Sequence, residues 1–267
     1  MKNIDINCDM GESYYDRKIG NDKQIMKYIS SCNIACGFHG GDPYTISKTI
    51  DYALINNVKI GAHPSFNDIE GFGRRILKVS NKQLKNEIIY QISAVKGMVE
   101  SKGGTLNHVK AHGALYNLAT KNNDVANIII ESISEIDKKL LIYGPSMMEW
   151  ETIAKKHQIK YIKEVFADRN YNDDLTLVNR KNNNSMIEDV DLMIIHLKNI
   201  INKGFVETVN KRKIAIEADT VCIHGDQKNA LLFAKSIYNE FKNLGSLFNK
   251  IKLISKKNKK IEIILVN

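Results

Sequence analysis

The sequence is poor in proline and aromatic residues and has no cysteine pair at CxxC spacing. It has 267 residues with 3 prolines, and aromatic residues make up 7% of it. No stretch rich in Pro, Gly or Ser interrupts the chain, which indicates one domain over residues 1–267 rather than linked domains. The 4 cysteines lie in or beside apolar runs, which favours buried reduced thiols over disulfides or a zinc knot. No charged leader with an apolar stretch opens the sequence, so we expect a cytoplasmic protein.

The sequence also has only weak signals for the binding of nucleotides or nucleic acid. The chain has no GxxxxGK[ST] loop, so an ATP site cannot be located by motif. A net charge of +9 would suit nucleic acid, but most lysines are scattered over helix-like segments. Only residues 249–266 are locally basic, and we interpret them as a solvated turn before a last strand. We therefore expect neither nucleic acid nor a membrane as a partner.

Short β-branched runs alternate with amphipathic stretches of helical length. The strand-like runs occupy residues 3–8, 32–36, 58–62, 105–110, 140–144, 161–166, 213–217, 221–224 and 261–266. The helix-like stretches occupy residues 45–56, 82–101, 124–138, 149–157, 186–203 and 227–243, the first opened by Asp42 and Pro43. Such alternation predicts parallel βα units, and the chain length is typical of a single β/α barrel. We interpret the irregular segment 168–184 as a loop over the site.

Polar clusters follow the apolar runs at the points where strands are expected to end. Four of the 7 histidines, His39, His63, His112 and His224, lie in these clusters. In a parallel barrel the carboxyl ends of all strands share one face, and active sites are built on the loops there. The sequence therefore predicts an enzyme whose histidines meet in one cavity.

The first two clusters supply carboxylates and a histidine. In IDINCDMGES, Asn7 and Asp9 lie two residues apart and so point to the same side of a strand, and Glu12 would add a second carboxylate. A helix-capping or solvent-facing acid pair is an equally open interpretation of this segment alone. In CGFHGGDP, three glycines flank His39, which permits close approach of the backbone to a ligand.

The next two clusters add cations and histidines. GAHPSFNDIEGFGRR places His63 just after a strand and then Arg74 and Arg75. A guanidinium fork suits a carboxylate or a phosphate, although a surface arginine pair is equally compatible with the pattern. In NHVKAHGALYN, Lys110 and His112 are spaced by two and should point the same way. Lys110 could then offset oxyanion charge, and His112 could transfer a proton near neutral pH.

The last two clusters are FADR and CIHGD. Asp168 and Arg169 are neighbours whose side chains should diverge, and His224 is followed two residues later by Asp226. A structural His–Asp pair is common, so this cluster is informative mainly in company with the others. His108 is in phase with Lys110 and His112 but lies earlier in the strand, and we expect it to pack or bond inside the barrel.

Seven motifs together carry a family resemblance. The strings DINCDMGES, NIACGFHGGDP, IGAHPSF, GFGRR, KAHGALYN, EVFADRNY and CIHGD resemble, in order, the signature motifs of the LamB/YcsF family, understood as the A subunit of the bacterial ATP-dependent 5-oxoprolinase. The similarity runs from Ile4 to about Asp226. The chain departs from the family pattern at Ala111, where proline is usual, at Gly40, where alanine is usual, and at Tyr15, where glycine is common.

The resemblance implies a modified, TIM-like β/α barrel related to the glycoside hydrolase/deacetylase superfamily. It further implies that subunits B and C join this chain to hydrolyse 5-oxoproline to glutamate with cleavage of ATP, so that ATP and a divalent cation, expected to be Mg²⁺, are its cofactors. The expected catalytic residues are Asp9, His39, His63, Lys110, His112 and His224. The expected substrate-binding residues are Asn7, Glu12, Arg74, Arg75, Asp168, Arg169 and Asp226.

Two other functions stay open at this point. A self-sufficient metal-dependent hydrolase of the carbohydrate deacetylase kind would hold a divalent ion by one carboxylate and two histidines, for which Asp9, His63 and His112 are the candidates. A nucleic-acid-binding module would account for the charge but would leave the strand-end clusters without a purpose.

Overall fold

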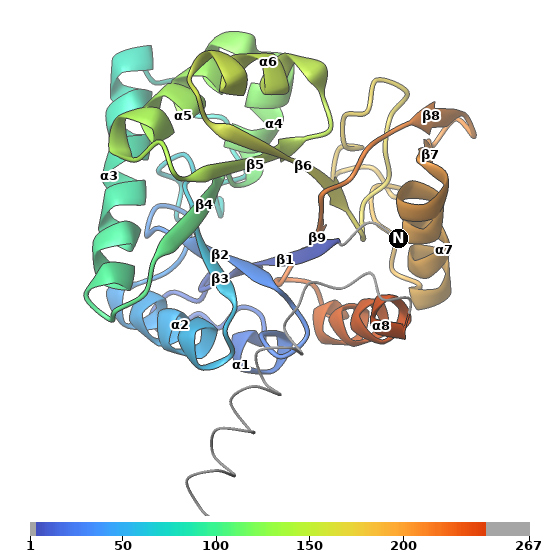
Figure 1. Ribbon diagram of the computed structural model, residues 1–267, viewed down its shortest axis with the longest axis horizontal. Coiled ribbons are helices and arrows are strands. Elements are labelled where there is room, and N and C mark those ends of the chain that lie inside the picture. The colour runs from blue at the N-terminus through green and yellow to red at the C-terminus, as the bar shows by residue number, and fades with distance from the viewer. Residues whose placement is uncertain (1–3, 244–267) are drawn as a thin grey trace, which may run out of the picture.

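The computed structural model describes residues 4–243, which form a closed barrel of seven parallel strands wrapped by helices (Figure 1). The barrel strands are β1 (Asp5–Met10), β2 (Ser31–Ala35), β3 (Lys59–His63), β4 (Leu106–Lys110), β5 (Leu141–Pro145), β6 (Lys160–Phe166) and β9 (Thr220–Ile223). Strand β9 pairs with β6 on one side and with β1 on the other, which closes the barrel. The β/α barrel expected from the alternation of runs is therefore confirmed.

Helices on the outside of the barrel match the six amphipathic stretches of the sequence. They are α2 (Pro43–Ile55), α3 (Asn81–Glu100), α5 (Asn123–Ile136), α6 (Met148–Lys156), α7 (Val190–Lys203) and α8 (Ala230–Asn243). Helix α2 begins as predicted, because the Asp42 carboxylate accepts hydrogen bonds from the main-chain N–H groups of Tyr44 and Thr45. Two further helices, α1 (Asp22–Ile25) and α4 (Gly113–Lys121), were not predicted, since each lies inside or beside a polar motif.

One predicted strand lies outside the barrel. The run 213–217 was expected among the parallel strands, but β8 (Lys213–Ala215) pairs antiparallel with β7 (Phe205–Glu207) in a separate two-stranded sheet. Lys213 and Ala215 are exposed and only Ile214 is partly buried, so this run has too little apolar surface for a barrel strand. The expected strand 261–266 and the basic segment before it lie outside the described residues.

The barrel interior is polar. Asn33 donates hydrogen bonds from Nδ2 to Asn7 Oδ1 (2.8 Å) and to Asp9 Oδ1 (2.9 Å). His108 Nε2 lies 2.8 Å from Asn33 Oδ1, so His108 bonds inside the barrel as expected. All of these side chains are buried. Because a buried polar group is stable only when it is hydrogen-bonded, this network fixes the inward side chains of β1, β2 and β4.

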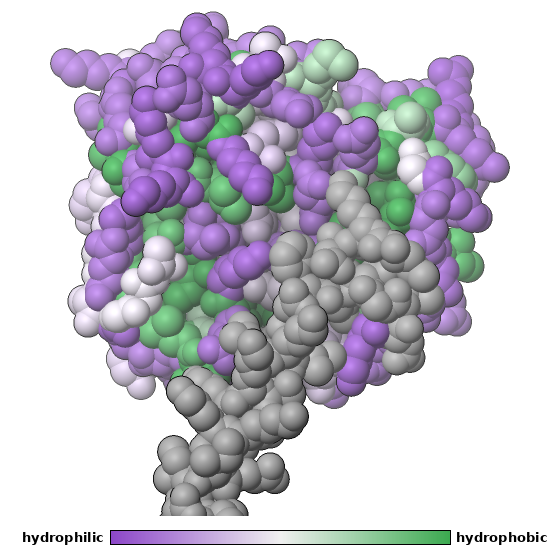
Figure 2. Space-filling model, in the orientation of Figure 1, coloured by the Kyte–Doolittle hydropathy of each residue, from purple (hydrophilic) through white to green (hydrophobic). Residues whose placement is uncertain are grey.

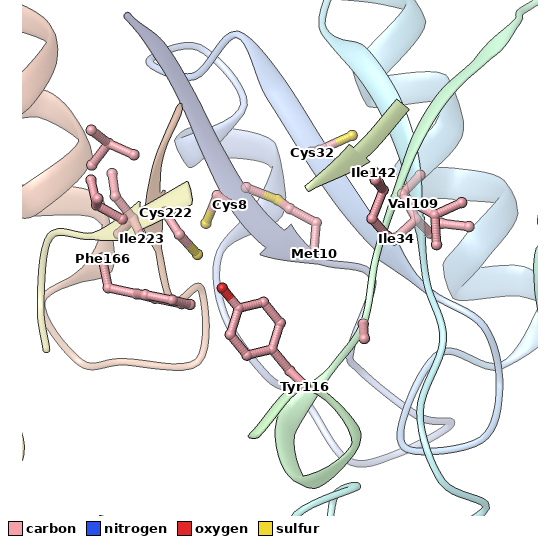
Figure 3. Close-up of a cluster of buried hydrophobic side chains, with 14 of the residues drawn as sticks. Cys8, Met10, Cys32, Ile34, Val109, Tyr116, Ile142, Phe166, Cys222 and Ile223 are labelled. Atoms are coloured by element: carbon pink, nitrogen blue, oxygen red, sulfur yellow. The ribbon is translucent and has the colours of Figure 1, made fainter. Parts of the chain in front are cut away.

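The apolar core packs around the polar interior and under the helices. Alternation along β1 puts Cys8 and Met10 on the side opposite Asp9, and Figure 3 shows them with Cys32 and Ile34 in a cluster of buried side chains. All four cysteines of the chain are free and buried, as the sequence indicated. On the surface shown in Figure 2, hydrophilic side chains predominate. No helix within residues 4–243 has the length and apolarity needed to cross a membrane.

Tyr15 has a strained backbone. Its φ of 50° lies in the left-handed region, which glycine adopts without cost and a tyrosine does not. It sits in a tight turn in which Tyr14 and Arg17 exchange main-chain hydrogen bonds of 2.9 and 3.0 Å. The turn therefore favours glycine at this position, and the strain at Tyr15 is confined to a surface loop.

Gly61 on β3 is expected to be essential for barrel packing. A Cβ built at Gly61 would lie 2.2 Å from Nε2 of the buried His108 ring, whereas a Cβ at Gly97 in α3 meets nothing within 4 Å. We expect Gly61→Ala to lower the free energy of unfolding by about 1–3 kcal/mol through overpacking. The control Gly97→Ala should raise it by about 0.5–1 kcal/mol through better helix propensity. Urea denaturation of both variants measures this, and equal effects would contradict the packing argument.

Candidate active site

A cavity of about 550 Å³ opens at the carboxyl ends of the barrel strands. Its lining includes most of the polar clusters picked out in the sequence, among them Asp9, Glu12, His63, Lys110, His112 and His224. A separate surface groove of about 640 Å³ lies along α3, lined by side chains such as Phe38 and Tyr90 and by no histidine. The chemistry is therefore concentrated in the cavity at the strand ends.

Lys110 lies at the floor of the cavity between two carboxylates. Its ammonium is 2.7 Å from Asp9 Oδ1, 3.3 Å from Glu164 Oε1 and 2.9 Å from Cys222 Sγ, and the side chain is 2% exposed. Burial lowers the pKa of Lys110, but its neighbours, Asp9 foremost, outweigh burial and hold that pKa well above its usual value. Lys110 is therefore cationic, and because it is buried it supports the fold as well as the site.

Asp9 is an anion in spite of its burial. Burial by itself raises the pKa of Asp9, but His63 and Lys110 outweigh it and hold that pKa well below its usual value. Burial raises the pKa of Glu164, with Lys110 opposing the rise. Glu164 was missed in the sequence, although it opens the motif EVFADRNY and is in phase with Phe166 and Asp168 along β6. Counting back from Asp168 in steps of two, as side chains alternate along a strand, would have identified Glu164.

Hydrogen bonds to main-chain and hydroxyl oxygens fix the tautomers of three histidines. His63 Nδ1 lies 2.6 Å from the carbonyl oxygen of Lys110, so Nδ1 must donate. His112 Nε2 lies 2.9 Å from the carbonyl oxygen of Phe72, so Nε2 must donate. His39 Nδ1 lies 3.0 Å from Ser65 Oγ, whose own proton goes to the Phe66 carbonyl oxygen, so His39 Nδ1 also donates. In each neutral ring the other nitrogen therefore carries a lone pair.

These lone pairs converge with Glu12. His112 Nδ1 lies 3.0 Å from His63 Nε2 and 3.5 Å from Glu12 Oε1, and His39 Nε2 lies 3.3 Å from the same Glu12 oxygen. The His39 and His112 rings stack at 3.7 Å between centroids. Glu12 Oε1 and His39 Nε2 are buried without a hydrogen-bond partner, which costs about 1–3 kcal/mol for each group. These nitrogen and oxygen atoms can all accept a hydrogen bond but none of them donates one. A shared proton or a bound cation is needed to stabilise them so close together.

The four residues form a group that could hold a metal ion. The ligand atoms of Glu12, His39, His63 and His112 all lie within 4.8 Å of one another. A tetrahedral zinc ion with ligand bonds of about 2.0–2.1 Å would separate its ligand atoms by roughly 3.3–3.4 Å. The separations of 3.0–3.5 Å given above are close to that value. The group shares His63 and His112 with the metal set proposed from the sequence, and it contains Glu12 and His39 where that set has Asp9.

His224 faces the cavity from the end of β9 and is held by Asp168. Its Nδ1 lies 2.9 and 3.0 Å from the two carboxylate oxygens of Asp168, which also accepts a hydrogen bond of 2.6 Å from Gln227. Burial raises the pKa of Asp168, but His224 outweighs it and the net direction is downward. Burial lowers the pKa of His224, with Asp168 opposing. The pair is thus a neutral imidazole oriented by a carboxylate.

The remaining predicted residues lie in different places. Arg74 and Asp226 form a close ion pair at the cavity wall. Arg75 points away, is 57% exposed and pairs with Asp68, so its position argues against the substrate-binding role assigned to it. Asn7 and His39 do not line the cavity, since Asn7 lies deeper in the barrel and His39 lies behind His112. The expectation that all the motif histidines line one cavity is therefore wrong for His39.

Asp168 and Arg169 diverge as expected. Arg169 donates hydrogen bonds to the main-chain carbonyl oxygens of Val178 and Ser185, whereas Asp168 turns to His224. Residues 170–189 fold as an irregular segment along the cavity, and we call them the strap. Tyr116 was also missed in the sequence; its hydroxyl is buried near the floor without a hydrogen-bond partner. Its place in HGALYN, at the start of α4, was the available signal.

Comparisons with known proteins agree over nearly the whole chain. Residues 4–256 match the LamB/YcsF family. A relative from Bacillus cereus (strain B4264), named as the A subunit of 5-oxoprolinase, is 45% identical over 246 residues, covering 92% of this chain and 97% of the relative. One of the same name from Bacillus mycoides (strain KBAB4) is 44% identical, covering 91% and 96%.

Solved structures show the same fold. A crystal structure described as a lactam utilization protein, from Thermus thermophilus, superposes with a TM-score of 0.85 at 34% identity and covers 92% of this chain and 98% of that one. A protein from Enterococcus faecalis has a TM-score of 0.55 at 13% identity, covering 94% and 98%. The second likeness is one of fold alone.

The buried histidines predict a loss of stability in acid. Burial, followed by neighbouring histidines, lowers the pKa of His39 and of His112 well below its usual value. Below about pH 6.5 the unfolded chain binds protons on these rings that the folded chain does not, so the free energy of unfolding falls as pH falls. We expect a loss of about 2–4 kcal/mol between pH 7 and pH 5, measured by urea denaturation in EDTA.

Two variants test whether the pH dependence of stability comes from the histidines of the site. His112→Asn should remove part of the pH dependence, whereas His157→Asn, at the partly exposed end of α6, should leave it unchanged. A flat stability profile in the wild type between pH 7 and pH 5 would contradict the neutral histidine cluster.

Proposed function

The chain belongs to the LamB/YcsF family, and on that premise we propose that it is the A subunit of a 5-oxoprolinase, a hydrolase that opens the cyclic amide of 5-oxoproline to give glutamate. The observation that carries the proposal is the buried Asp9–His63 contact of 3.3 Å beside Lys110 at the floor of the cavity. It supplies a proton acceptor and a fixed cation next to each other. The relatives that carry this name match the chain almost from end to end.

The residues suit the addition of water to an amide. Asp9 and His63 take a proton from the attacking water, because the Asp9 carboxylate and the lone pair of His63 Nε2 lie 3.3 Å apart and both accept protons. Lys110 lies where negative charge on the carbonyl oxygen would be offset. The proton taken from water then passes from His63 to the ring nitrogen as the C–N bond breaks, and His224, oriented by Asp168, accepts a hydrogen bond from the ring N–H through its free nitrogen. The products are a carboxylate and an amine, so the atoms balance.

We assign the use of ATP to the assembly rather than to this chain alone. An unstrained lactam is resonance-stabilised, and coupling to ATP would activate its carbonyl oxygen before water adds. The sequence has no phosphate loop, and therefore we propose that partner subunits B and C, or the interface with them, bind ATP with Mg²⁺. Four free buried thiols suit a reducing compartment, and we propose a cytoplasmic location.

Reconstitution tests this function. We expect the purified chain alone to show little or no turnover of 5-oxoproline and the mixture with subunits B and C to couple lactam opening to ATP hydrolysis. In that mixture His63→Asn should lower turnover about 10²- to 10⁴-fold, because asparagine keeps a donor for the Lys110 carbonyl oxygen but cannot accept a proton.

The measurement is glutamate release beside ADP release, with a thermal melt of each variant. Equal turnover by the chain alone would overturn the assignment to an assembly. Normal turnover by a folded His63→Asn variant would remove His63 from the reaction.

A second candidate is a metal-dependent hydrolase that works without partners, as in carbohydrate deacetylases. The convergence of unprotonated nitrogens and Glu12 favours it, because these atoms lack donors of their own. Glu12, His39, His63 and His112 would hold a divalent ion of the zinc type, and such an ion, when bound, acidifies a water molecule for attack. This candidate and the first differ in their need for subunits B and C.

Measuring the metal content of the protein shows whether the Glu12–histidine group holds a cation or shares a proton. We expect about one Zn²⁺ per chain after dialysis and a melting temperature several degrees higher than in EDTA, since a ligand at 100 times its dissociation constant stabilises by about 2.7 kcal/mol. His39→Asn should abolish both effects, whereas His196→Asn, bonded to the Phe166 carbonyl oxygen, should abolish neither. Elemental analysis and calorimetric melts measure them. A metal-free chain with an unchanged melt would leave the shared proton as the explanation.

A further inference from the structure

The strap carries an arginine without a charged partner. Arg180 lines the cavity and is half-buried. Within residues 4–243 no carboxylate forms an ion pair with its guanidinium, and Ser185 Oγ donates a hydrogen bond to its main-chain carbonyl oxygen. A free guanidinium facing a cavity is available to an anion.

Arg169 lines the same cavity as Arg180 and adds a second positive charge. It is 3% exposed, and its hydrogen bonds go to carbonyl oxygens rather than to a carboxylate. Burial and the nearby Arg180 lower the pKa of Arg169 to about 10. A buried charge of this kind is stable only with a counter-charge.

The carboxylates around this wall are already engaged. Asp226 pairs with Arg74, and both oxygens of Asp168 contact His224. Three arginines, Arg74, Arg169 and Arg180, thus line the cavity with one ion-paired carboxylate among them. The wall has a surplus of positive charge that the described residues do not neutralise.

Main-chain hydrogen bonds tie the strap, which carries Arg180, to itself and to the end of β6. The main-chain N–H of Val178 donates to the carbonyl oxygen of Asn170 (3.0 Å), and that of Ile187 donates to that of Asp168 (3.0 Å). In Figure 1 the strap lies between β6 and α7, beside β9. An anion held here would share the cavity with His224, because Arg180 and His224 both line it.

We propose that Arg180, backed by Arg169, forms the subsite that binds the carboxylate of the substrate. The inference rests on the proposed function, in which the substrate is a five-membered lactam bearing one carboxylate. A planar guanidinium matches a carboxylate through two parallel hydrogen bonds. With the carboxylate held at the strap, the ring projects between His224 on one side and the Asp9–His63 contact on the other. Arg180 thereby takes the role that the sequence assigned to the Arg74–Arg75 pair.

Three small probes separate the carboxylate from the lactam. L-5-oxoproline has both groups, cyclopentanecarboxylate has only the carboxylate, and 2-pyrrolidinone has only the lactam. We expect Arg180→Gln to weaken binding of the first two by about 10- to 100-fold, the loss that accompanies removal of a charge-assisted hydrogen bond, and to leave 2-pyrrolidinone unaffected. Binding is measured by calorimetry or NMR titration of the isolated full chain.

Two further variants make the test specific. Arg75→Gln, the matched control outside the cavity, should change none of the three affinities. Arg180→Lys should recover part of the lost affinity, because it restores the charge without the fork. In the assembly with subunits B and C, Arg180→Gln should raise KM for 5-oxoproline more than it lowers kcat. A thermal melt shows whether each variant is folded.

The outcomes distinguish this inference from the proposed function. If cyclopentanecarboxylate binds in an Arg180-dependent way but the wild-type assembly opens no lactam, the subsite stands and the proposed function fails. If the assembly is active and folded Arg180→Gln binds both carboxylates as the wild type does, the subsite is overturned and the function stands. Arg180-dependent binding of inorganic phosphate alone, without either carboxylate probe, would also overturn the assignment.

Discussion

The site depends on one buried cation held between two carboxylates. Lys110, at the end of β4, contacts Asp9 on β1 and Glu164 on β6, so a single ammonium joins strands from three parts of the chain. Removing one member of such a buried group typically costs about 3–5 kcal/mol, because the others are left without a counter-charge. The hydrogen-bonded interior beneath it, through Asn7 and Asn33, keeps the two carboxylates in place. The same Lys110 contacts therefore hold the barrel strands together and set the charges of the site.

The protonation of the histidines follows from the same geometry. Carbonyl oxygens of Lys110 and Phe72 accept from His63 and His112, and these are main-chain atoms whose positions the fold sets. The free nitrogens are therefore turned toward one another and toward Glu12 rather than toward solvent. A cluster of this kind is costly without a proton or a cation to share, and the cost is met by the stability of the surrounding barrel.

The cavity has two chemically different sides. The floor, from β1, β3 and β4, holds the Asp9–His63 contact and Lys110, whereas the other side holds Arg169 and, on the strap, Arg180. His224 and Asp168 lie between them. A small anionic ring would meet cations that orient it on one side and proton-transfer groups on the other. The strap is irregular, but main-chain hydrogen bonds hold it in place. It can therefore position side chains in the cavity as the strands do.

Local sequence patterns predicted the barrel and most of the residues around its open end. The alternation of apolar runs gave the βα units because a parallel barrel buries both faces of its strands. The spacing of two in Asn7 and Asp9, and in Lys110 and His112, placed each pair on one side of a strand because side chains alternate. Those inferences need only the geometry of a single strand, and the structure agrees with them.

Other features depended on which elements lie next to one another in space. Run 213–217 has the composition of a strand, but its exposed Lys213 and Ala215 pair with β7 outside the barrel. Arg74 and Arg75 are adjacent in sequence, yet opposite ion pairs, with Asp226 and with Asp68, send one to the cavity and the other to the surface. The sequence by itself determined the fold class and the polar clusters, since these follow from periodicity and strand ends. The tertiary structure alone decided the Glu12–histidine group, the Lys110 contacts and the free Arg180, because each depends on distances between residues far apart in the chain.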